Sequence, residues 1–584
     1  MPRRGARLGR IFIGLHGAVS DIVSERPTAA FRRNAEKCPK SWGMSTTVCK
    51  SVSKHTSAFV EKPAEPPNIS SIPINPMSNA STPAAGDSLR KRYLFKLIAN
   101  AAGIPLYFVL EALMPRALGP AAYGNFSFAT NVFLQFSAFL DMGTSTCLAT
   151  TLSKNPHDDA SVALYLRFSL VVLALCLGAG CLALIPTVGD ALLPGVPAFM
   201  APAAAFWAYL TWAGRTTRGV NDALGLTVGG EALRTIVSLL SALALAGLFL
   251  AGVLSIPVLF LHQYVFLGAA AVGFALLARR AKPGWSLRLS EEKAKERARM
   301  FWAYSSPLFI AALGSAAALS GERWMLQFFG GSVEQGFFSL GQKVGMACFL
   351  FVTALTPLLM REMAAAHGSN NPRLMAALVD RYAPMIYAVS AWFACFTFAE
   401  APAVVRLFGG AAFAGAVWPV AIMSLYPIHQ GYGQVAASVF YAAGETKAYR
   451  NLTLLTLVPG TALSWFVLAP ADLFGLDLGS YGLAVKMVLV QAISVNILLF
   501  ACRRIVPFGY GRNLLHQVIA APAFALAAFA CRLGTEWFAP ADNLWRFFGS
   551  GFLYCLVTGL LILLVPFLAG LKREDFDKLR HLRR

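Results

Sequence analysis

The chain has 584 residues, of which 57% are hydrophobic and 14% are charged. A soluble globular protein carries about a quarter charged residues, so this composition excludes a water-soluble protein built from several domains. The net charge of +21 would suit nucleic-acid binding, but the Lys and Arg residues fall in alternate loops between apolar segments, as in a membrane protein. The ten cysteines include no C-x-x-C pair, and those inside apolar runs, which are most of them, are interpreted as small buried hydrophobic residues.

Residues 1–90 form a polar N-terminal segment rich in Ser, Pro, Asn and basic residues. They contain no apolar run of about 20 residues, the length that a membrane span requires. We therefore predict a disordered cytoplasmic tail. Two alternatives remain. The arginines before Ile11 weakly resemble a signal peptide, and Met44 or Met77 is a possible start, of which Met77 would leave only a short tail.

Fourteen apolar segments follow, each long enough to cross a bilayer. They lie near 93–115, 123–142, 161–185, 197–214, 224–250, 255–278, 301–325, 336–360, 382–404, 413–441, 450–469, 480–502, 514–532 and 547–569. The pattern predicts an all-α polytopic membrane protein with about 14 transmembrane helices.

The loops between these segments differ strongly in their content of Lys and Arg. Twenty-nine such residues lie on one side, whereas the opposite side holds only Arg116, Arg323, Arg406, Arg532 and Arg546. Because cytoplasmic loops carry the positive excess, both termini are predicted to be cytoplasmic. The excess is thus a sign of topology, and nucleic acid is not an expected partner.

An internal repeat relates helices one and two to helices seven and eight. Residues 111–127 align with residues 322–339, with Gly119 opposite Gly330 and a one-residue insertion after that glycine. Six helices separate the copies, so both enter the membrane in the same sense. Such a parallel repeat is typical of transporters that work by alternating access. Chance similarity between glycine-rich segments is the alternative.

The repeat and the loop lengths predict a division of the chain into two six-helix lobes and two trailing helices. The predicted segments are the tail 1–90, the N-lobe 91–280 with helices 1–6, a cytoplasmic basic linker 281–300, the C-lobe 301–504 with helices 7–12, helices 13–14 in 505–570, and a basic cytoplasmic tail 571–584. Within the linker, residues 291–297 are expected to form a surface helix.

Four cationic residues lie inside predicted spans, where a charge costs about 2.5–3.5 kcal/mol and so indicates a cavity or a partner. These candidate substrate-binding residues are Lys343, Lys486, Arg234 and Arg167. Facing a seam between the lobes, they would form a positive lumen suited to a phosphorylated or otherwise anionic substrate. The alternatives are snorkelling of Arg167 to the interface and an ion pair of Arg234 with Glu231.

Three acidic residues in the spans are candidates for ion coupling. Glu111 and Glu322 occupy equivalent positions in the two repeats, and Glu231 lies deeper. Each could take up a proton during transport. The competing interpretation is that both glutamates lie at the interface and either cap a helix or pair with Arg116 and Arg323. The sequence contains no Walker P-loop, H-E-x-x-H, G-x-S-x-G or Cys/His cluster, so no enzyme activity, metal or cofactor is expected.

Four short motifs occur in order at the ends of predicted spans. They are Arg116-Ala-Leu-Gly119-Pro120-Ala-Ala-Tyr123-Gly124, Asp141-Met142-Gly143, Leu407-Phe408-Gly409-Gly410-Ala-Ala-Phe413 and Gly444-Glu445-Thr446-Lys447. Together they resemble motifs of the polysaccharide transporters, the Wzx-type O-antigen flippases of the multidrug/oligosaccharidyl-lipid/polysaccharide exporter superfamily. The resemblance covers roughly residues 90–570. It departs at Glu322-Arg323, where many relatives carry Asp before Arg.

The resemblance implies a flippase of a bacterial inner membrane that moves a polyprenyl-diphosphate-linked oligosaccharide from the cytoplasmic to the outer leaflet for surface polysaccharide biosynthesis. The cationic residues would then meet the diphosphate and acidic sugars. Implied partners are the lipid-linked oligosaccharide and membrane lipids, with a polysaccharide polymerase and export machinery as candidates. The alternatives are a drug or metabolite antiporter, a lipid II flippase, and an intramembrane glycan polymerase or ligase.

Overall fold

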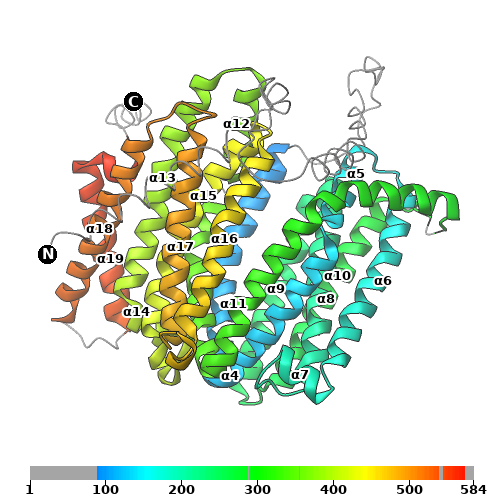
Figure 1. Cartoon of the computed structure of the whole chain (residues 1–584), viewed down its shortest axis with the longest axis horizontal. Helices are drawn as coiled ribbons and strands as arrows, with labels where there is room; N and C mark the ends of the chain where they lie inside the picture. Colours follow the sequence, from blue (N-terminus) through cyan, green and yellow to red (C-terminus); the bar gives the residue numbers. More distant parts are fainter. Residues whose placement is uncertain (1–88, 287, 354–355, 538–543, 572–584) are drawn as a thin grey trace, which may run out of the picture. The chain divides into compact units, whose positions relative to one another are not determined.

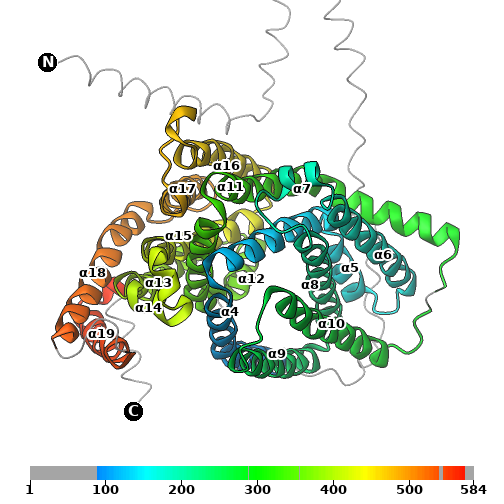
Figure 2. The same ribbon diagram turned by 90° about the horizontal axis from the view of Figure 1, so that it is seen from below.

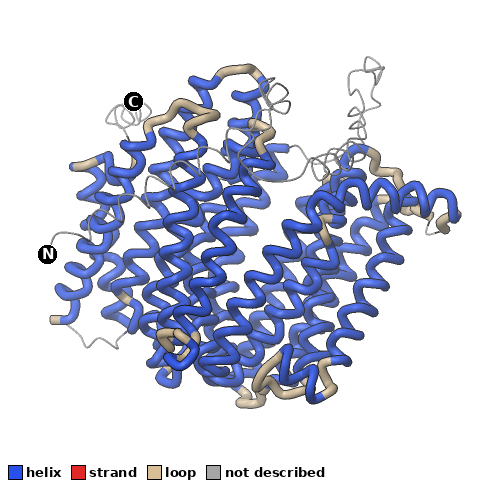
Figure 3. The backbone as a smooth tube through the Cα atoms, in the orientation of Figure 1, coloured by secondary structure: helices blue, strands red, loops and turns tan. Residues whose placement is uncertain are grey.

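The computed structural model describes residues 89–286, 288–353, 356–537 and 544–571. Most of the predicted N-terminal tail and of the basic C-terminal tail lies outside these ranges, so the disorder of the former stays a prediction. Every regular element in the described ranges is a helix (Figure 3). The predicted all-α class is therefore confirmed.

The helices follow one another with short connections (Figure 1). In chain order they are α4 (Leu89–Asp141), α5 (Thr144–Lys154), α6 (Asp159–Leu182), α7 (Pro186–Leu192), α8 (Met200–Ala223), α9 (Thr227–Leu250), α10 (Ile256–Ala281), α11 (Glu291–Thr353), α12 (Thr356–Gly368), α13 (Pro372–Ala399), α14 (Ala401–Gly409), η2 (Ala411–Ala416), α15 (Val417–Ala442), α16 (Thr446–Leu468), η3 (Ala471–Leu473), α17 (Gly479–Cys502), α18 (Tyr510–Glu536), α19 (Leu544–Leu564) and η4 (Pro566–Ala569).

The two longest helices, α4 and α11, each contain a turn at one glycine. Gly119 has φ 74° and ψ 171°, and Gly331 has φ 76° and ψ −175°. Glycine adopts positive φ at little cost because it lacks a Cβ atom. Each of these helices therefore holds two of the predicted spans, so all fourteen predicted spans have a helical counterpart. We call the end of the bundle with the two turns the glycine end and the opposite end the linker end.

The protein is a polytopic membrane protein. Within the described residues, nine helices are long and apolar enough to cross a membrane, and a tenth span is present if the bent pair of α4 and α5 counts as one.

The structure differs from the prediction for the basic linker in one respect. Its surface helix is not separate, because α11 begins at Glu291 and continues without a break into the seventh span. An ion pair between Lys295 and Glu291 at 2.9 Å stabilises this first part of α11.

The two glycine turns correct the predicted alignment of the repeat. The glycine equivalent to Gly119 in conformation is Gly331 and not Gly330, so the one-residue insertion falls before the turn. Two further glycines then match at the same spacing. A Cβ on Gly124 would lie 1.9 Å from the carbonyl oxygen of Ser332, and a Cβ on Gly336 would lie 2.2 Å from that of Pro120. The two copies thus pack against each other through reciprocal contacts, as a two-fold repeat requires.

The reciprocal packing makes a prediction about stability. Gly336→Ala should lower the free energy of unfolding by about 1–3 kcal/mol, because the added methyl group meets backbone and forces the helices apart. Gly321→Ala is the matched control, since a Cβ at that position of α11 meets no atom within 4 Å. Thermal unfolding in detergent measures both. Equal stability of the two variants would refute the close contact.

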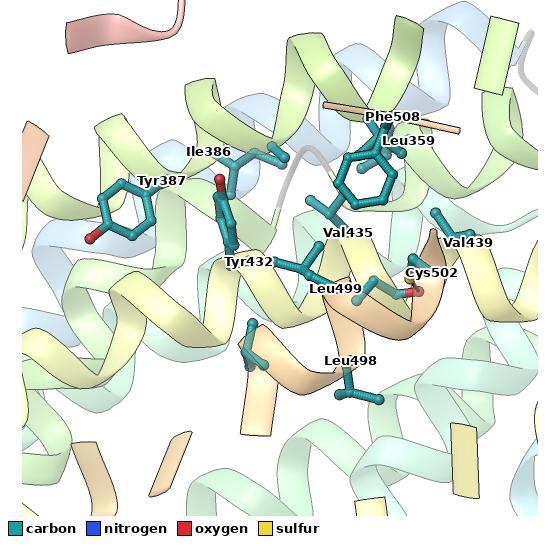
Figure 4. Close-up of a cluster of buried hydrophobic side chains, with 14 of the residues drawn as sticks. Leu359, Ile386, Tyr387, Tyr432, Val435, Val439, Leu498, Leu499, Cys502 and Phe508 are labelled. Carbon is teal, nitrogen blue, oxygen red and sulfur yellow. Dashed lines mark hydrogen bonds between the residues drawn. The ribbon is translucent and has the colours of Figure 1, made fainter. Parts of the chain in front are cut away.

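Two large hydrophobic cores hold the helices together. One contains residues of α4, α8, α9, α10 and α14, including Phe128, Met200 and Leu259. The other lies among α12, α13, α15 and α17, where Tyr387, Tyr432 and other buried side chains meet (Figure 4). Figure 2, viewed from the glycine end, shows α4, α8, α9 and α10 as neighbours, in agreement with their contacts. These cores place the charged residues described next between rigid helices.

Candidate functional site

One carboxylate joins α8 to α9 by holding two arginines. The Oε1 atom of Glu231 lies 2.5 Å from Nη2 of Arg218, and Oε2 lies 2.8 Å from Nε of Arg234. The side chain of Glu231 is 1% exposed, whereas those of Arg218 and Arg234 are 33% and 28% exposed. We call these three residues the arginine pair site. It carries a net charge of +1, and its guanidinium groups remain accessible.

The short connection between α8 and α9 creates this arrangement. The helix α8 ends at Ala223 and α9 begins at Thr227, so Glu231 lies about one turn inside its helix, facing the last turns of α8. The side chain of Arg234 also reaches α4, where a Cβ on Gly103 would lie 3.9 Å from its Nη1 atom. The ion pair between Glu231 and Arg234, an alternative left open by the sequence, is present. The sequence did not single out Arg218.

A second ion pair joins the two halves of the repeat. Nζ of Lys343 in α11 donates to Oε1 of Glu111 in α4 at 2.5 Å. The side chain of Lys343 is 40% exposed, whereas Glu111 is buried. The hydroxyl of Tyr107 donates to the carbonyl oxygen of Lys343 at 3.4 Å, so a second contact holds α4 and α11 at this level. Lys343 therefore lies at a surface that a ligand can reach.

A third ion pair is buried between α11 and α17. Nζ of Lys486 donates to Oε1 of Glu322, and both side chains are buried. The adjacent Arg323 donates to the hydroxyl of Ser339 at 2.8 Å and to the amide oxygen of Gln342.

A cavity of about 110 Å³ adjoins this buried pair. Its lining includes Glu322, Arg323 and Gln342 on one side and Asn131 and Gln135 of α4 on the other. Polar residues from both halves of the repeat therefore meet here, and the cavity has room for a few water molecules.

These contacts correct the predicted pairing of the two equivalent glutamates. Glu111 does not pair with Arg116, nor Glu322 with Arg323; each binds a lysine from another helix. Arg116 instead donates to the carbonyl oxygen of Arg406 at 2.9 Å. The physical reason is geometric, because side chains one or five positions apart point to different sides of a helix, whereas a long lysine side chain on a facing helix reaches the buried carboxylate.

Arg167 is the one predicted substrate-binding residue that the structure leaves apart. Its side chain is exposed on α6, beside the exposed Leu166, Leu170 and Val171. No ion pair joins it to another described residue. An arginine on an apolar helix face of this kind extends its charge toward the membrane interface.

The Asp141-Met142-Gly143 motif has a structural role. The carboxylate of Asp141 accepts hydrogen bonds from the Gly143 amide at 3.2 Å, the Ser145 hydroxyl at 2.8 Å, the Tyr165 hydroxyl at 3.1 Å and the Trp212 indole at 3.0 Å. These donors lie at the start of α5, in α6 and in α8. Asp141 therefore fixes the bend between α4 and α5 and ties it to α6 and α8.

Sequence reasoning missed a fully buried ion pair near the trailing helices. Arg546 in α19 donates to both oxygens of Glu400, at 2.6 and 3.3 Å, and the two side chains are 1% and 0% exposed. Arg532 of α18 donates to the carbonyl oxygen of Ala399 at 2.6 Å beside it. These contacts attach α18 and α19 to the end of α13. The only sequence signal was an acid, Glu400, at the end of an apolar segment.

The described residues contain no group of three or more His, Cys, Asp or Glu side chains that could hold a metal ion. What the charged groups can do is bind and exchange an anion. Three carboxylates hold four cationic side chains, and a ligand with phosphate oxygens would compete with those carboxylates for the same N–H donors.

Part of the chain is similar to a known protein family. Residues 89–361, just under half of the chain, match the family model described as polysaccharide biosynthesis protein. Over this range the chain is similar to the polysaccharide biosynthesis protein family. The predicted resemblance to polysaccharide transporters is thereby confirmed. No curated protein matches the sequence significantly.

Solved structures with a similar fold align with most of the chain. The lipid II flippase MurJ in an inward closed conformation aligns with a TM-score of 0.58 and 12% identity, covering 81% of this chain and 99% of MurJ. An inward-facing multidrug resistance MATE transporter aligns with a TM-score of 0.48 and 16% identity over 72% of this chain and 95% of its own. A MOP superfamily transporter from Pyrococcus furiosus aligns with a TM-score of 0.47 and 15% identity, covering 71% of this chain and 95% of its own. At such low identity the MurJ comparison establishes the fold alone.

Proposed function

We propose that this chain is a flippase that moves a polyprenyl-diphosphate-linked oligosaccharide from the cytoplasmic to the outer leaflet. The arginine pair site carries the proposal. It presents two partly exposed guanidinium groups on one buried carboxylate. A guanidinium group binds phosphate oxygens through two parallel N–H donors, so a diphosphate can take the place of Glu231 at Arg218 and Arg234 once protonation neutralises this buried carboxylate.

The proposed orientation places the linker end in the cytoplasm of a bacterium and the glycine end outside its inner membrane. The excess of Lys and Arg in the loops of the linker end supports it. Both termini are then cytoplasmic. The arginine pair site, near the ends of α8 and α9 at the linker end, meets a substrate that arrives from the cytoplasmic leaflet.

The proposed mechanism is alternating access between an N-lobe, residues 91–280, and a C-lobe, residues 301–504, with helices 13 and 14 in 505–570. Hydrogen bonds at the glycine end support a state closed on that side. The Ser332 hydroxyl donates to the Asn125 side chain at 2.6 Å, and the Trp324 indole donates to the Ala191 carbonyl at 2.8 Å. Breaking these contacts would open the outer side.

The three carboxylates are proposed as the coupling groups, and the exposed Lys343 as the second cation that meets the substrate. Protonation of Glu231, Glu111 or Glu322 would release its cationic partner. A released arginine or lysine binds an anion more tightly, so a proton and the substrate would favour the same state. Lys486 would contribute only in a state that opens its buried pair.

Deletion of the gene tests the proposal against its alternatives. A flippase mutant should lose surface polysaccharide and accumulate complete lipid-linked repeat units that outside enzymes cannot reach. Loss of an intramembrane polymerase or ligase would instead leave single units exported. Cell-wall failure with trapped lipid II would indicate a lipid II flippase. Unchanged polysaccharide with altered drug sensitivity would indicate an antiporter and contradict the proposal.

A further inference from the structure

A cavity of about 580 Å³ lies away from the arginine pair site, between α13, α18 and η4. Arg373, Arg381 and Arg512 contribute positive charge to its lining, and Asp380 contributes the one negative charge. Three positive charges and one negative charge give a net +2. Both α13 and α18 begin at this cavity, and helix N-termini favour anions.

Two buried polar side chains of α18 line the cavity without the partners that burial normally requires. Asn513 is 2% exposed, and neither its side-chain oxygen nor its nitrogen has a hydrogen-bond partner in the described chain. His516 is also buried; its Nε2 atom lies 3.2 Å from the Leu568 carbonyl oxygen, while Nδ1 has no partner. Buried polar groups are rarely left unsatisfied, so an absent ligand or water is expected to meet them.

The chemistry of the lining favours a phosphate group. The guanidinium groups of arginine and the side-chain NH₂ group of Asn513 donate hydrogen bonds to phosphate oxygens. Asp380 is already engaged, since it accepts from Arg512 at 3.3 Å and from the Gly509 amide at 3.0 Å. A water molecule occupies about 30 Å³ in the liquid. The cavity, at about 580 Å³, therefore has room for a phosphate group and for neighbouring parts of the same ligand. Apolar residues such as Phe567 and Leu571 complete the lining.

We propose that this cavity binds the phosphate of an anionic phospholipid headgroup, at a site separate from the transport pathway. Basic pockets between membrane helices at the cytoplasmic surface bind such headgroups, and the lining combines arginine side chains with apolar residues. The site lies at the ends of α13 and α18, beside the η4 turn that follows α19. Its occupation would link α18 and α19 to α13. The proposal goes beyond the flippase function and does not depend on it.

Native mass spectrometry of the full-length protein in detergent tests the site with phosphatidylglycerol, phosphatidylcholine of the same chain length, and inorganic phosphate. Phosphatidylglycerol should bind more tightly than phosphatidylcholine. Arg373→Gln with Arg512→Gln should weaken phosphatidylglycerol binding by about tenfold or more. Arg503→Gln with Arg504→Gln, which removes the same two charges from exposed positions outside the lining, should change it less than about twofold.

The remaining outcomes assign the ligand or overturn the site. In one outcome, millimolar inorganic phosphate displaces phosphatidylglycerol and binds equally well to lipid-free protein. That result would show that the cavity binds the phosphate of a soluble compound, and it would overturn the assignment to a phospholipid. Equal binding of the two lipids overturns the proposal. So does an unchanged affinity in the double arginine variant, whose substituted positions are exposed and whose fold is verified by thermal unfolding.

Discussion

Replacing Arg546 by methionine is expected to lower the free energy of unfolding by about 3–5 kcal/mol. The variant leaves Glu400, which is 0% exposed, without its charge partner in a nonpolar environment. The trailing helices α18 and α19 should detach first, because this pair and the Arg532 contact attach them to α13. Thermal unfolding of the detergent-solubilised protein measures the loss.

A double variant separates the charge from the packing. Glu400→Leu combined with Arg546→Met removes both charges and should recover stability to within about 1 kcal/mol of the original chain. Arg504→Met is the matched single control, since Arg504 is exposed, and should change stability by less than about 0.5 kcal/mol. If the double variant were no more stable than Arg546→Met, the buried pair would not explain the attachment.

Replacing Arg234 by glutamine should lower the transport rate by about tenfold to a hundredfold, the largest expected effect on function. A charge-assisted hydrogen bond contributes about 1.5–3 kcal/mol, and this variant removes one such donor from the diphosphate. Stability should change little, because Glu231 keeps its 2.5 Å contact with Arg218. Export of surface polysaccharide, normalised to membrane abundance, is the measurement.

Two further variants separate the geometry of the guanidinium group from its charge. Arg234→Lys keeps the charge but loses the planar fork, so it should retain partial transport. Arg280→Gln removes the same charge from the exposed end of α10 and should leave transport unchanged. Full transport by Arg234→Gln at normal abundance would remove the arginine pair site from the proposed mechanism.

The helices were predictable from the sequence because their signal is local. An apolar run of about 20 residues identifies a span wherever it packs. The register of the repeat was harder, since Gly330 and Gly331 are adjacent and only the positive φ at Gly331 identifies the turn. The continuous start of α11 at Glu291 was missed for a related reason, because composition marks where the apolar run begins and not where the helix begins.

The partners of the charged residues were not predictable because they are far apart in the chain. Lys343 and Glu111 are separated by 232 positions, and Lys486 and Glu322 by 164. Sequence proximity favoured the neighbouring arginines, yet the packing of facing helices decides which charges meet. Glu231 and Arg234 were the exception, since residues three apart share one face of a helix.

Transport itself is tested most directly in proteoliposomes that contain the purified chain and a fluorescent polyprenyl-diphosphate-linked oligosaccharide. A membrane-impermeant reductant added outside destroys only the label that it can reach. If the chain is a flippase for this substrate, the reductant should eliminate label from both leaflets in vesicles with the protein and from the outer leaflet alone in vesicles without it. Label that stays protected in the inner leaflet despite folded, correctly inserted protein would contradict the proposed function.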